Sequence, residues 1–295
     1  NGINVVETVL VTGGAGSMGR LVVNQLISKN YLVKVFDLPQ ANFEGFDGSK
    51  TELLKGDLNN SDDLKKAVRD TDCIIHLAAI LPPTANTNIE LAKIVNVNGT
   101  KKLIESVKKY NPNVHFVFSS SVSIYGKNLN NKVVDENTSP NPDDNYAITK
   151  YESEKIVTEA KIKFTVLRIS GVSIPVFQEP PSEWPFLKNQ LIEFVHRDDV
   201  VDAICNTVGN KDSVNKVFNI SGGETWRTNG ETYVKDYFNL VEVDINTANY
   251  QKEAGHFSWY ETDKSNNILK YQNKKYAIYL SEIKEDIERL LGSYE

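Results

Sequence analysis

The stretch Thr8-Val9-Leu10-Val11-Thr12-Gly13-Gly14-Ala15-Gly16-Ser17-Met18-Gly19 decides the fold of this 295-residue chain. Its first five residues form an apolar, β-branched run, which is typical of a buried strand. Gly13, Gly16 and Gly19 then permit a tight turn, and the residues from Ser17 to Lys29 carry apolar positions at helical spacing. Such a turn lets the backbone approach a pyrophosphate at the helix N-terminus. The strand-turn-helix context therefore favours a dinucleotide site over a merely structural turn.

Strand-like and helix-like segments alternate through the rest of the first half. Short apolar runs predict further strands at 32–36, 53–54, 73–77, 114–118, 164–169 and 217–220. Helical patterns are expected from 61, at 89–110 and 144–161, from 198, and at 281–291. This rhythm predicts an α/β fold, a Rossmann-type doubly wound parallel sheet with a smaller C-terminal α/β substrate lobe. We expect the dinucleotide-binding domain at 5–170, with 195–220 returning to it, and the substrate-binding lobe at 171–194 and 221–295.

Small and polar residues follow the predicted strands at the point where each strand ends. They include Asp37, Asp57, Ala78, Ala79, Ser119 to Ser121, and Ser170. Because the carboxyl ends of parallel strands share one edge of the sheet, these residues should converge where open α/β folds bind ligands. The segments 81–88, 121–125 and 172–194 are the candidate substrate-contact loops.

Two acids follow the strands nearest the glycine turn. Asp37 stands 18 residues after Gly19, where a carboxylate can accept hydrogen bonds from an adenosine ribose and repels a 2′-phosphate. Leu38 offers no charge to hold that phosphate, so NAD is favoured over NADP. The alternative is a solvated turn acid. Asp57 could reach the adenine amino group or, equally, cap the following helix.

Tyr146 and Lys150 are four residues apart, so a helix places them on one face. A nearby ammonium is expected to lower the tyrosine pKa from its usual value of about 10. The phenol could then exchange a proton with a substrate hydroxyl near neutral pH. The alternative is a core tyrosine. Together with the upstream serines and the glycine turn, the pair predicts a nicotinamide-dependent enzyme that oxidises or reduces a carbon bearing oxygen.

Composition excludes several other classes of protein. The net charge of −6 argues against a dedicated nucleic-acid binder. No apolar run approaches the roughly 18 residues that a membrane span needs. Cys73 and Cys205 lack metal-ligand spacing and the four histidines are not clustered, so no metal site is expected. The N-terminus shows no signal-peptide pattern, which fits a cytoplasmic location.

An ordered set of motifs extends from residue 8 to about 220. It comprises the glycine turn, Asp37, Gly56-Asp57-Leu58, His76-Leu77-Ala78-Ala79, Asn96-Val97-Asn98-Gly99-Thr100, Ser119-Ser120-Ser121 with Tyr125-Gly126, Tyr146 to Lys150, Leu167-Arg168, and Val195-His196-Arg197-Asp198-Asp199-Val200. With these residues the chain resembles an extended short-chain dehydrogenase/reductase of the NAD-dependent epimerase/dehydratase family, in its UDP-glucose 4-epimerase-like form.

The resemblance implies a role for each matching position. Ser121 would contact the substrate hydroxyl or carbonyl, Tyr146 would be the acid/base, and Lys150 would bind the ribose and activate the tyrosine. The implied NAD-binding residues are Gly13, Gly16, Ser17, Met18, Gly19, Asp37, Asp57, Leu58, Leu77, Ala78, Ala79, Asn98, Ser119, Tyr146, Lys150 and Ile169. The implied substrate-binding residues are Ser121, Ser123, Thr84 and Arg197. Homodimers are common among such relatives, so a homodimer is expected.

Two departures from the family pattern bear on the reaction. Family dehydratases carry an Asp-Glu pair after the catalytic serine or threonine, but Val122 and Ser123 stand here, which disfavours dehydration. The segment between Arg168 and His196 is short, so a smaller substrate is expected, or a nucleotide bound differently. The resemblance favours a sugar or nucleotide-sugar epimerase. The alternative is a dehydrogenase or reductase of a small sugar, sugar acid or alcohol, and the remote alternative is a non-catalytic NAD-binding sensor.

Overall fold

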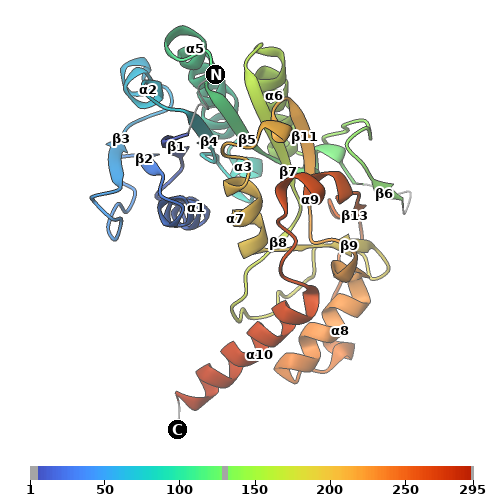
Figure 1. Ribbon diagram of the computed structural model, residues 1–295. Coiled ribbons are helices and arrows are strands. Elements are labelled where there is room, and N and C mark those ends of the chain that lie inside the picture. Colours follow the sequence, from blue (N-terminus) through green and yellow to red (C-terminus); the bar gives the residue numbers. More distant parts are fainter. Residues whose placement is uncertain (1–5, 128–131, 294–295) are drawn as a thin grey trace.

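The computed structural model describes residues 6–127 and 132–293, and a parallel seven-stranded sheet runs through it (Figure 1). Its strand order is β11-β7-β5-β4-β1-β2-β3. The strands are β1 (Thr8–Thr12), β2 (Leu32–Asp37), β3 (Thr51–Lys55), β4 (Cys73–His76), β5 (His115–Ser121), β7 (Lys163–Ile169) and β11 (Lys216–Ile220). The order reverses direction between β1 and β4, which is the switch point of a Rossmann sheet. The predicted fold class is confirmed.

Helices cover both faces of this sheet. They are α1 (Ser17–Ser28) and α7 (Arg197–Cys205) on one face, and α2 (Ser61–Val68), α5 (Thr100–Tyr110) and α6 (Asn145–Glu159) on the other. Successive residues of a strand point to opposite faces. Accordingly, Val9 and Val11 pack into the core beneath α1 and α7, while Leu10 packs into the core beneath α2 and α5. Both sides of β1 are therefore apolar, as in a buried parallel strand.

Several helix boundaries differ from the predictions. The helix expected at 89–110 is built from α4 (Ile89–Ala92), a π-helical segment η1 (Lys93–Gly99) and α5. The last helix, α10 (Tyr276–Gly292), begins five residues before the predicted Ser281. The side chain of Asn60 caps α2, and that of His196 caps α7. Asp198 and Asp199 lie in the first turn of α7, after this cap.

The second half of the chain adds short ribbons and a pair of helices below the sheet edge (Figure 1). The remaining elements are α3 (Thr84–Thr87), η2 (Val122–Tyr125), β6 (Val133–Val134), β8 (Val172–Ser173), β9 (Leu191–Glu193), β10 (Val195–His196), η3 (Lys211–Ser213), η4 (Glu224–Trp226), β12 (Arg227–Asn229), α8 (Gly230–Val241), η5 (Ile245–Thr247), β13 (Trp259–Tyr260) and α9 (Asp263–Leu269). Helices α8 and α10 pack against each other around an aromatic core that includes Trp184, Trp226 and Tyr233.

Two further features place this lobe beside the sheet. The segment from β10 through α7 to β11 returns to the sheet, where β11 pairs with β7 and Gln25 of α1 donates a hydrogen bond to Asp202 of α7. The loop after β7 runs through β8 directly to the aromatic core. Across the described residues, every helix is too short or too polar to cross a membrane.

Candidate active site at the carboxyl edge of the sheet

Three predicted catalytic side chains meet where β5 ends and α6 begins. The Asp144 carboxylate caps α6 by accepting from Ala147 N at 2.8 Å, which fixes the first turn of the helix. The Ser121 hydroxyl hydrogen-bonds the Tyr146 phenol. Lys150 lies one turn further on, and its Nζ donates to the Ser119 carbonyl at 2.9 Å. The structure thus brings the end of β5 and the predicted acid/base pair together.

The electrostatics of this group differ from the prediction. Burial first, and then the Asp144 charge, raise the pKa of Tyr146 to about 12, against the lowering effect of the Ser121 hydrogen bond. Burial also lowers the pKa of Lys150 to about 8. The expectation that Lys150 lowers the tyrosine pKa is therefore wrong for the protein side chains alone. The reason is geometric, because the ammonium is directed to the Ser119 carbonyl and lies 5.9 Å from the tyrosine ring centre.

A small cavity of about 170 Å³ opens beside these side chains. Ser121, Ser123, Tyr146 and Ile169 contribute to its walls. Ser123 is buried, and its hydroxyl has no hydrogen-bond partner among the described residues. Buried polar groups are nearly always paired, so this hydroxyl is suited to contact a ligand. The predicted substrate residues Thr84 and Arg197 do not line this cavity; Thr84 is exposed on α3, and Arg197 pairs with Asp198 at 3.2 Å.

The glycine turn has the shape that a dinucleotide needs. Gly13 has φ of +67°, and a Cβ there would lie 2.9 Å from Ala78 N, so the turn presses against the segment after β4. A Cβ on Gly19 would lie 2.1 Å from the Gly13 carbonyl oxygen. The N-terminus of α1 carries no side-chain cap, which leaves its first amide groups available to an anion. These features fit a bound pyrophosphate.

Of the two predicted acids, Asp37 contacts the glycine turn, whereas Asp57 bonds within its own loop. Asp37 accepts from Ala15 N at 3.1 Å and from Leu38 N at 2.8 Å, which holds its carboxylate beside the glycine turn. Asp57 is exposed and accepts from Asn59 N at 2.8 Å. The alternative reading of Asp57 as the cap of α2 is wrong, because Asn60 supplies that cap.

A buried hydrogen-bond chain locks the glycine turn to the strand ends. Thr12 Oγ1 accepts from the backbone N–H groups of Leu77 and Ala78, so its own proton goes to His76 Nδ1 at 2.6 Å. His76 Nε2 must then carry the ring proton and donate to Thr100 at 2.8 Å. Burial and then the charge of Lys150 lower the pKa of His76 to about 3, so the ring is neutral. His76, at the end of β4, therefore links the glycine turn to α5 through neutral hydrogen bonds.

The structure places Asn96, rather than the predicted Asn98, at this edge. Asn96 is buried, accepts from Ile80 N at 2.7 Å and donates to Thr149 Oγ1 at 3.1 Å. Asn98 is exposed, because residues two apart on a helix point to nearly opposite sides. Thr149 lies between Tyr146 and Lys150, so Asn96 connects the loop after β4 to the helix that carries them. The phase of the apolar pattern in 89–110 could have identified the inward-facing asparagine.

The other predicted cofactor residues lie around the same edge. Ser17 and Met18 form the first turn of α1, and Leu77, Ala78 and Ala79 follow β4. Leu58 is buried and packs under Gly99, where a Cβ would lie 3.0 Å from its side chain. These residues flank the turn without any visible conflict with a dinucleotide.

A buried ion pair joins α6 to the strand β7. Arg168 of β7 pairs with Glu154 of α6, which also accepts from the Ser120 hydroxyl at 2.8 Å. Arg168 further donates to the Tyr125 hydroxyl at 3.0 Å. The sequence reasoning missed Glu154, although its position four residues after Lys150 puts it on the same helix face. This network joins α6 to β5 and β7 at the level of the candidate site.

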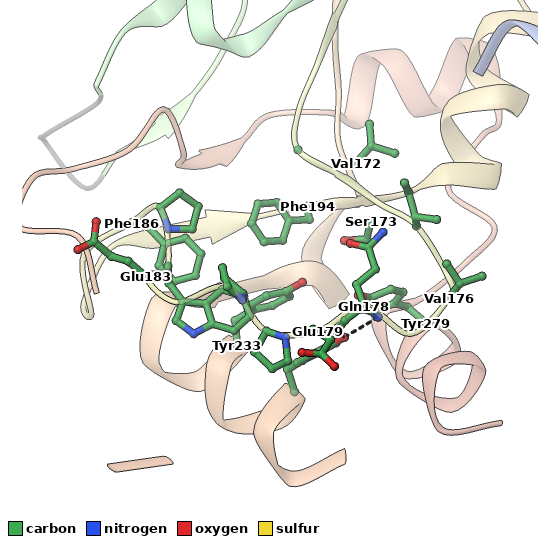
Figure 2. A pocket seen from close by; sticks show the side chains of 17 residues that line it. Val172, Ser173, Val176, Gln178, Glu179, Glu183, Phe186, Phe194, Tyr233 and Tyr279 are labelled. Atoms are coloured by element: carbon green, nitrogen blue, oxygen red, sulfur yellow. Dashed lines mark hydrogen bonds between the residues drawn. The ribbon is translucent and has the colours of Figure 1, made fainter. Parts of the chain in front are cut away.

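A second cavity, of about 560 Å³, adjoins the first at Gly171 (Figure 2). Its walls come from the predicted contact loop 172–194 and from α8 and α10. Figure 2 shows the rings of Phe186, Phe194 and Tyr233 around it. The sequence could not show that the α8 and α10 aromatics would reach this loop, because the contact joins segments about 50 to 100 residues apart.

Comparison with known proteins agrees with this geometry. Residues 9–183 match the NAD dependent epimerase/dehydratase family. A putative UDP-glucose 4-epimerase of Methanocaldococcus jannaschii is 29% identical over 260 residues, covering 80% of this chain and 82% of that protein. The Homo sapiens sterol-4-alpha-carboxylate 3-dehydrogenase, decarboxylating, is 34% identical over 178 residues, 58% of this chain. The match spans under half, 46%, of that dehydrogenase.

A solved structure supports the fold over nearly the whole chain. The UDP-glucuronic acid 4-epimerase of Bacillus cereus, in complex with NAD, superposes with a TM-score of 0.78 at 23% identity, covering 96% of this chain and 99% of that one. At this identity the likeness concerns the fold alone. The family match covers more than half of the chain and coincides with the glycine turn, the β5 end and α6. The chain therefore belongs to the NAD dependent epimerase/dehydratase family.

Proposed function

We propose that this protein oxidises and reduces a hydroxyl-bearing carbon of a small-molecule substrate, with Tyr146 as the acid/base. The observation that carries the proposal is the meeting of Ser121, Tyr146 and Lys150 beside a small cavity with an unpaired buried hydroxyl. NAD, when bound, supplies the hydride acceptor or donor. The glycine turn, Asp37 and the open N-terminus of α1 would hold its adenosine and pyrophosphate parts.

Each of the three side chains has a distinct task in this proposal. Tyr146 takes the proton of the substrate hydroxyl or returns it to the carbonyl oxygen, and Ser121 keeps that oxygen within hydrogen-bond reach of the phenol. Because burial raises the pKa of Tyr146 to about 12, the phenol is protonated at neutral pH and ready to act as the acid. To act as the base it needs more positive charge than the Lys150 ammonium alone provides, and the oxidised nicotinamide ring of bound NAD would add it. General acid/base catalysis of this kind contributes roughly 10²–10⁴ in rate.

Epimerisation is the first form of this chemistry that we propose, with a sugar as substrate. The putative UDP-glucose 4-epimerase relative supports it, because that similarity extends over four fifths of both chains. Simple dehydrogenation is the second form, supported by the similarity to the sterol dehydrogenase, which is higher in identity, 34% against 29%, but extends over fewer residues. A non-catalytic sensor would have no need of the Ser121, Tyr146 and Lys150 arrangement.

Dehydration is not the reaction we propose. The small cavity of about 170 Å³ beside Tyr146 is called the reacting cavity from here on. The η2 turn after Ser121 presents Val122 and Ser123 to it, and neither side chain can act as an additional acid or base near neutral pH. The carboxylate of Asp144, which also lines the cavity, is engaged in capping α6. A cytoplasmic location and a homodimeric assembly stay predictions from the sequence.

Tyr146→Phe tests the proposal directly, with Tyr151→Phe of the same helix as the matched control. We expect Tyr146→Phe to lower kcat by about 10²–10⁴ without changing NAD binding, and Tyr151→Phe to leave both within about twofold. Turnover would be followed as NADH absorbance and as epimer formation over a panel of sugars and secondary alcohols. Undiminished turnover of Tyr146→Phe would remove the phenol from the mechanism.

Mass spectrometry of the denatured protein distinguishes the two forms of the reaction. An epimerase that retains its cofactor should release close to one NAD per chain. A dehydrogenase that exchanges its cofactor should be purified with far less and should need added NAD for turnover. A chain that neither retains nor binds added NAD would contradict both forms.

A further inference from the structure

We propose that the aromatic cavity beside the reacting cavity holds an uncharged, ring-bearing part of the substrate, and that the site disfavours nucleoside diphosphates. This inference rests on the proposed function, because it assigns the part of the substrate that does not react. It concerns the cavity of about 560 Å³ that meets the reacting cavity at Gly171.

A pair of packed aromatic rings lies between the two cavities. Phe257 lines the reacting cavity, and Phe194 lines the aromatic cavity; their rings meet edge to face with centres 5.4 Å apart. Gly171 belongs to both cavities, and a Cβ there would lie 2.5 Å from Phe194. The residue shared by the two cavities has no side chain, so a substrate with its carbinol carbon near Tyr146 has to pass the backbone of Gly171 to reach the aromatic cavity.

The walls of the aromatic cavity are suited to the flat face of a ring. Trp184 and Phe186 are stacked with centres 5.9 Å apart, and Phe194 meets Tyr233 at 5.0 Å. Aromatic side chains favour such offset and edge-to-face contacts with another ring. Ligand sites of this kind are mostly apolar, with a few polar groups that fix orientation.

Polar groups on one side of the cavity are neutral. The Tyr233 hydroxyl hydrogen-bonds Ser173 and Tyr279, and Figure 2 shows Ser173 and Tyr279 on the side away from Glu183. Three neighbouring hydroxyls can donate to or accept from a hydroxyl or ether oxygen. They offer no charge to a phosphate.

The charges around both cavities are wrong for a diphosphate. Among the described residues that line either cavity there is no lysine and no arginine. Exposed carboxylates, Glu179 and Glu183, line the aromatic cavity instead. His256, which lines the reacting cavity, lies between Asp143 and Asp144. Phosphate groups are normally bound by arginine, lysine or helix N-termini, so a diphosphate would meet repulsion without compensation here.

Binding of two probes that share a glucose ring tests this inference. Para-nitrophenyl glucoside carries an uncharged aromatic group, whereas UDP-glucose carries a nucleoside diphosphate. Affinities would be measured by calorimetry on NAD-loaded Tyr146→Phe protein, in which turnover of either probe should be slowed by about 10²–10⁴. We expect the neutral glucoside to bind at least tenfold more tightly than UDP-glucose at 50 mM salt, and the ratio to shrink at 500 mM salt as charge repulsion is screened.

Paired charge variants separate local repulsion from net charge. In the same background, Glu179→Gln with Glu183→Gln should tighten UDP-glucose binding about fivefold, since each exposed charge contributes modestly. The control pair, Glu285→Gln with Glu288→Gln on the exposed side of α10, removes the same charge elsewhere and should change it less than twofold.

Three results would overturn the inference. They are tighter binding of UDP-glucose than of the glucoside, no binding of either probe at 10 mM, and equal effects of the two variant pairs. If wild-type protein epimerised UDP-glucose and also bound it more tightly, the proposed Tyr146 chemistry would hold and only this inference would fail. Loss of the effect of Tyr146→Phe on turnover would instead remove the proposed chemistry.

Discussion

Lys150 and Arg168 are both buried cations at the carboxyl edge of the sheet, but they are compensated differently. Arg168 pairs with Glu154, and although burial alone would lower its pKa, the hydrogen bond and charge of Glu154 outweigh burial and raise it. Within residues 6–127 and 132–293, Lys150 has no carboxylate partner and only the Ser119 carbonyl as acceptor, and burial lowers its pKa to about 8. The Arg168–Glu154 pair therefore fixes α6 against β7, whereas the buried charge of Lys150 lowers the stability of the folded protein.

An uncompensated buried charge indicates a role in binding or catalysis. Glu154 lies on the same helix as Lys150 and one turn beyond it, so the compensated pair holds the helix in position, while the uncompensated cation donates to the end of β5. Breaking the pair should therefore damage the fold, whereas removing Lys150 should damage only the activity. Variants at these positions should therefore separate loss of stability from loss of activity.

The largest expected effect comes from Glu154→Ala, which leaves the Arg168 guanidinium buried without its partner. We expect a loss of about 3–5 kcal/mol in the free energy of unfolding, measured by urea denaturation. The double variant Glu154→Leu with Arg168→Met removes both charges and should recover most of that loss. A double variant as unstable as Glu154→Ala would show that the pair itself, rather than the stranded charge, supplies the stability.

Replacing Lys150 should have the opposite sign. Because its folded pKa of about 8 lies below the unfolded value of about 10.5, the charged form is disfavoured by folding at neutral pH. Lys150→Met should then stabilise NAD-free protein at pH 7 by about 2 kcal/mol after the lost Ser119 hydrogen bond is subtracted, while abolishing turnover. The gain should shrink as the pH rises from about 8 toward 10.5. Lys155→Met, an exposed change on α6, is the control; equal effects would refute the assignment.

The pH dependence of kcat/KM should report the lowered pKa of the Lys150 ammonium. As the pH rises through about 8, Lys150 loses its charge and kcat/KM should fall by up to tenfold per pH unit. Lys150→Arg keeps its charge at all accessible pH values, so whatever activity it retains should lack this alkaline limb. An unchanged limb in Lys150→Arg would assign the titration to another group.

Much of this arrangement could be predicted from the sequence, and the part that could not depends on long-range contacts. Strand periodicity and the glycine turn predict the sheet, and its parallel order brings Ser121 and Tyr146 together. The direction of the Lys150 ammonium is not encoded in its spacing from Tyr146, so the predicted pKa shift of the phenol had the wrong sign. The inward-facing asparagine, Asn96, is within reach of the sequence, because the apolar pattern of 89–110 gives the helix phase that the motif spacing behind Asn98 does not.

The smallest expected effect concerns the hydroxyl that links the two regions. Ser120 donates to Glu154 at 2.8 Å, while its neighbours Ser119 and Ser121 contact Lys150 and Tyr146. Ser120→Ala should cost about 1–2 kcal/mol in unfolding free energy, because Glu154 keeps Arg168 but loses one charge-assisted hydrogen bond. Since the side chain of Ser120 points away from the reacting cavity toward α6, kcat should change less than about threefold when measured below the unfolding transition. A loss of kcat approaching that of Tyr146→Phe would mean that the ion pair takes part in catalysis and that the two cations are not functionally separate.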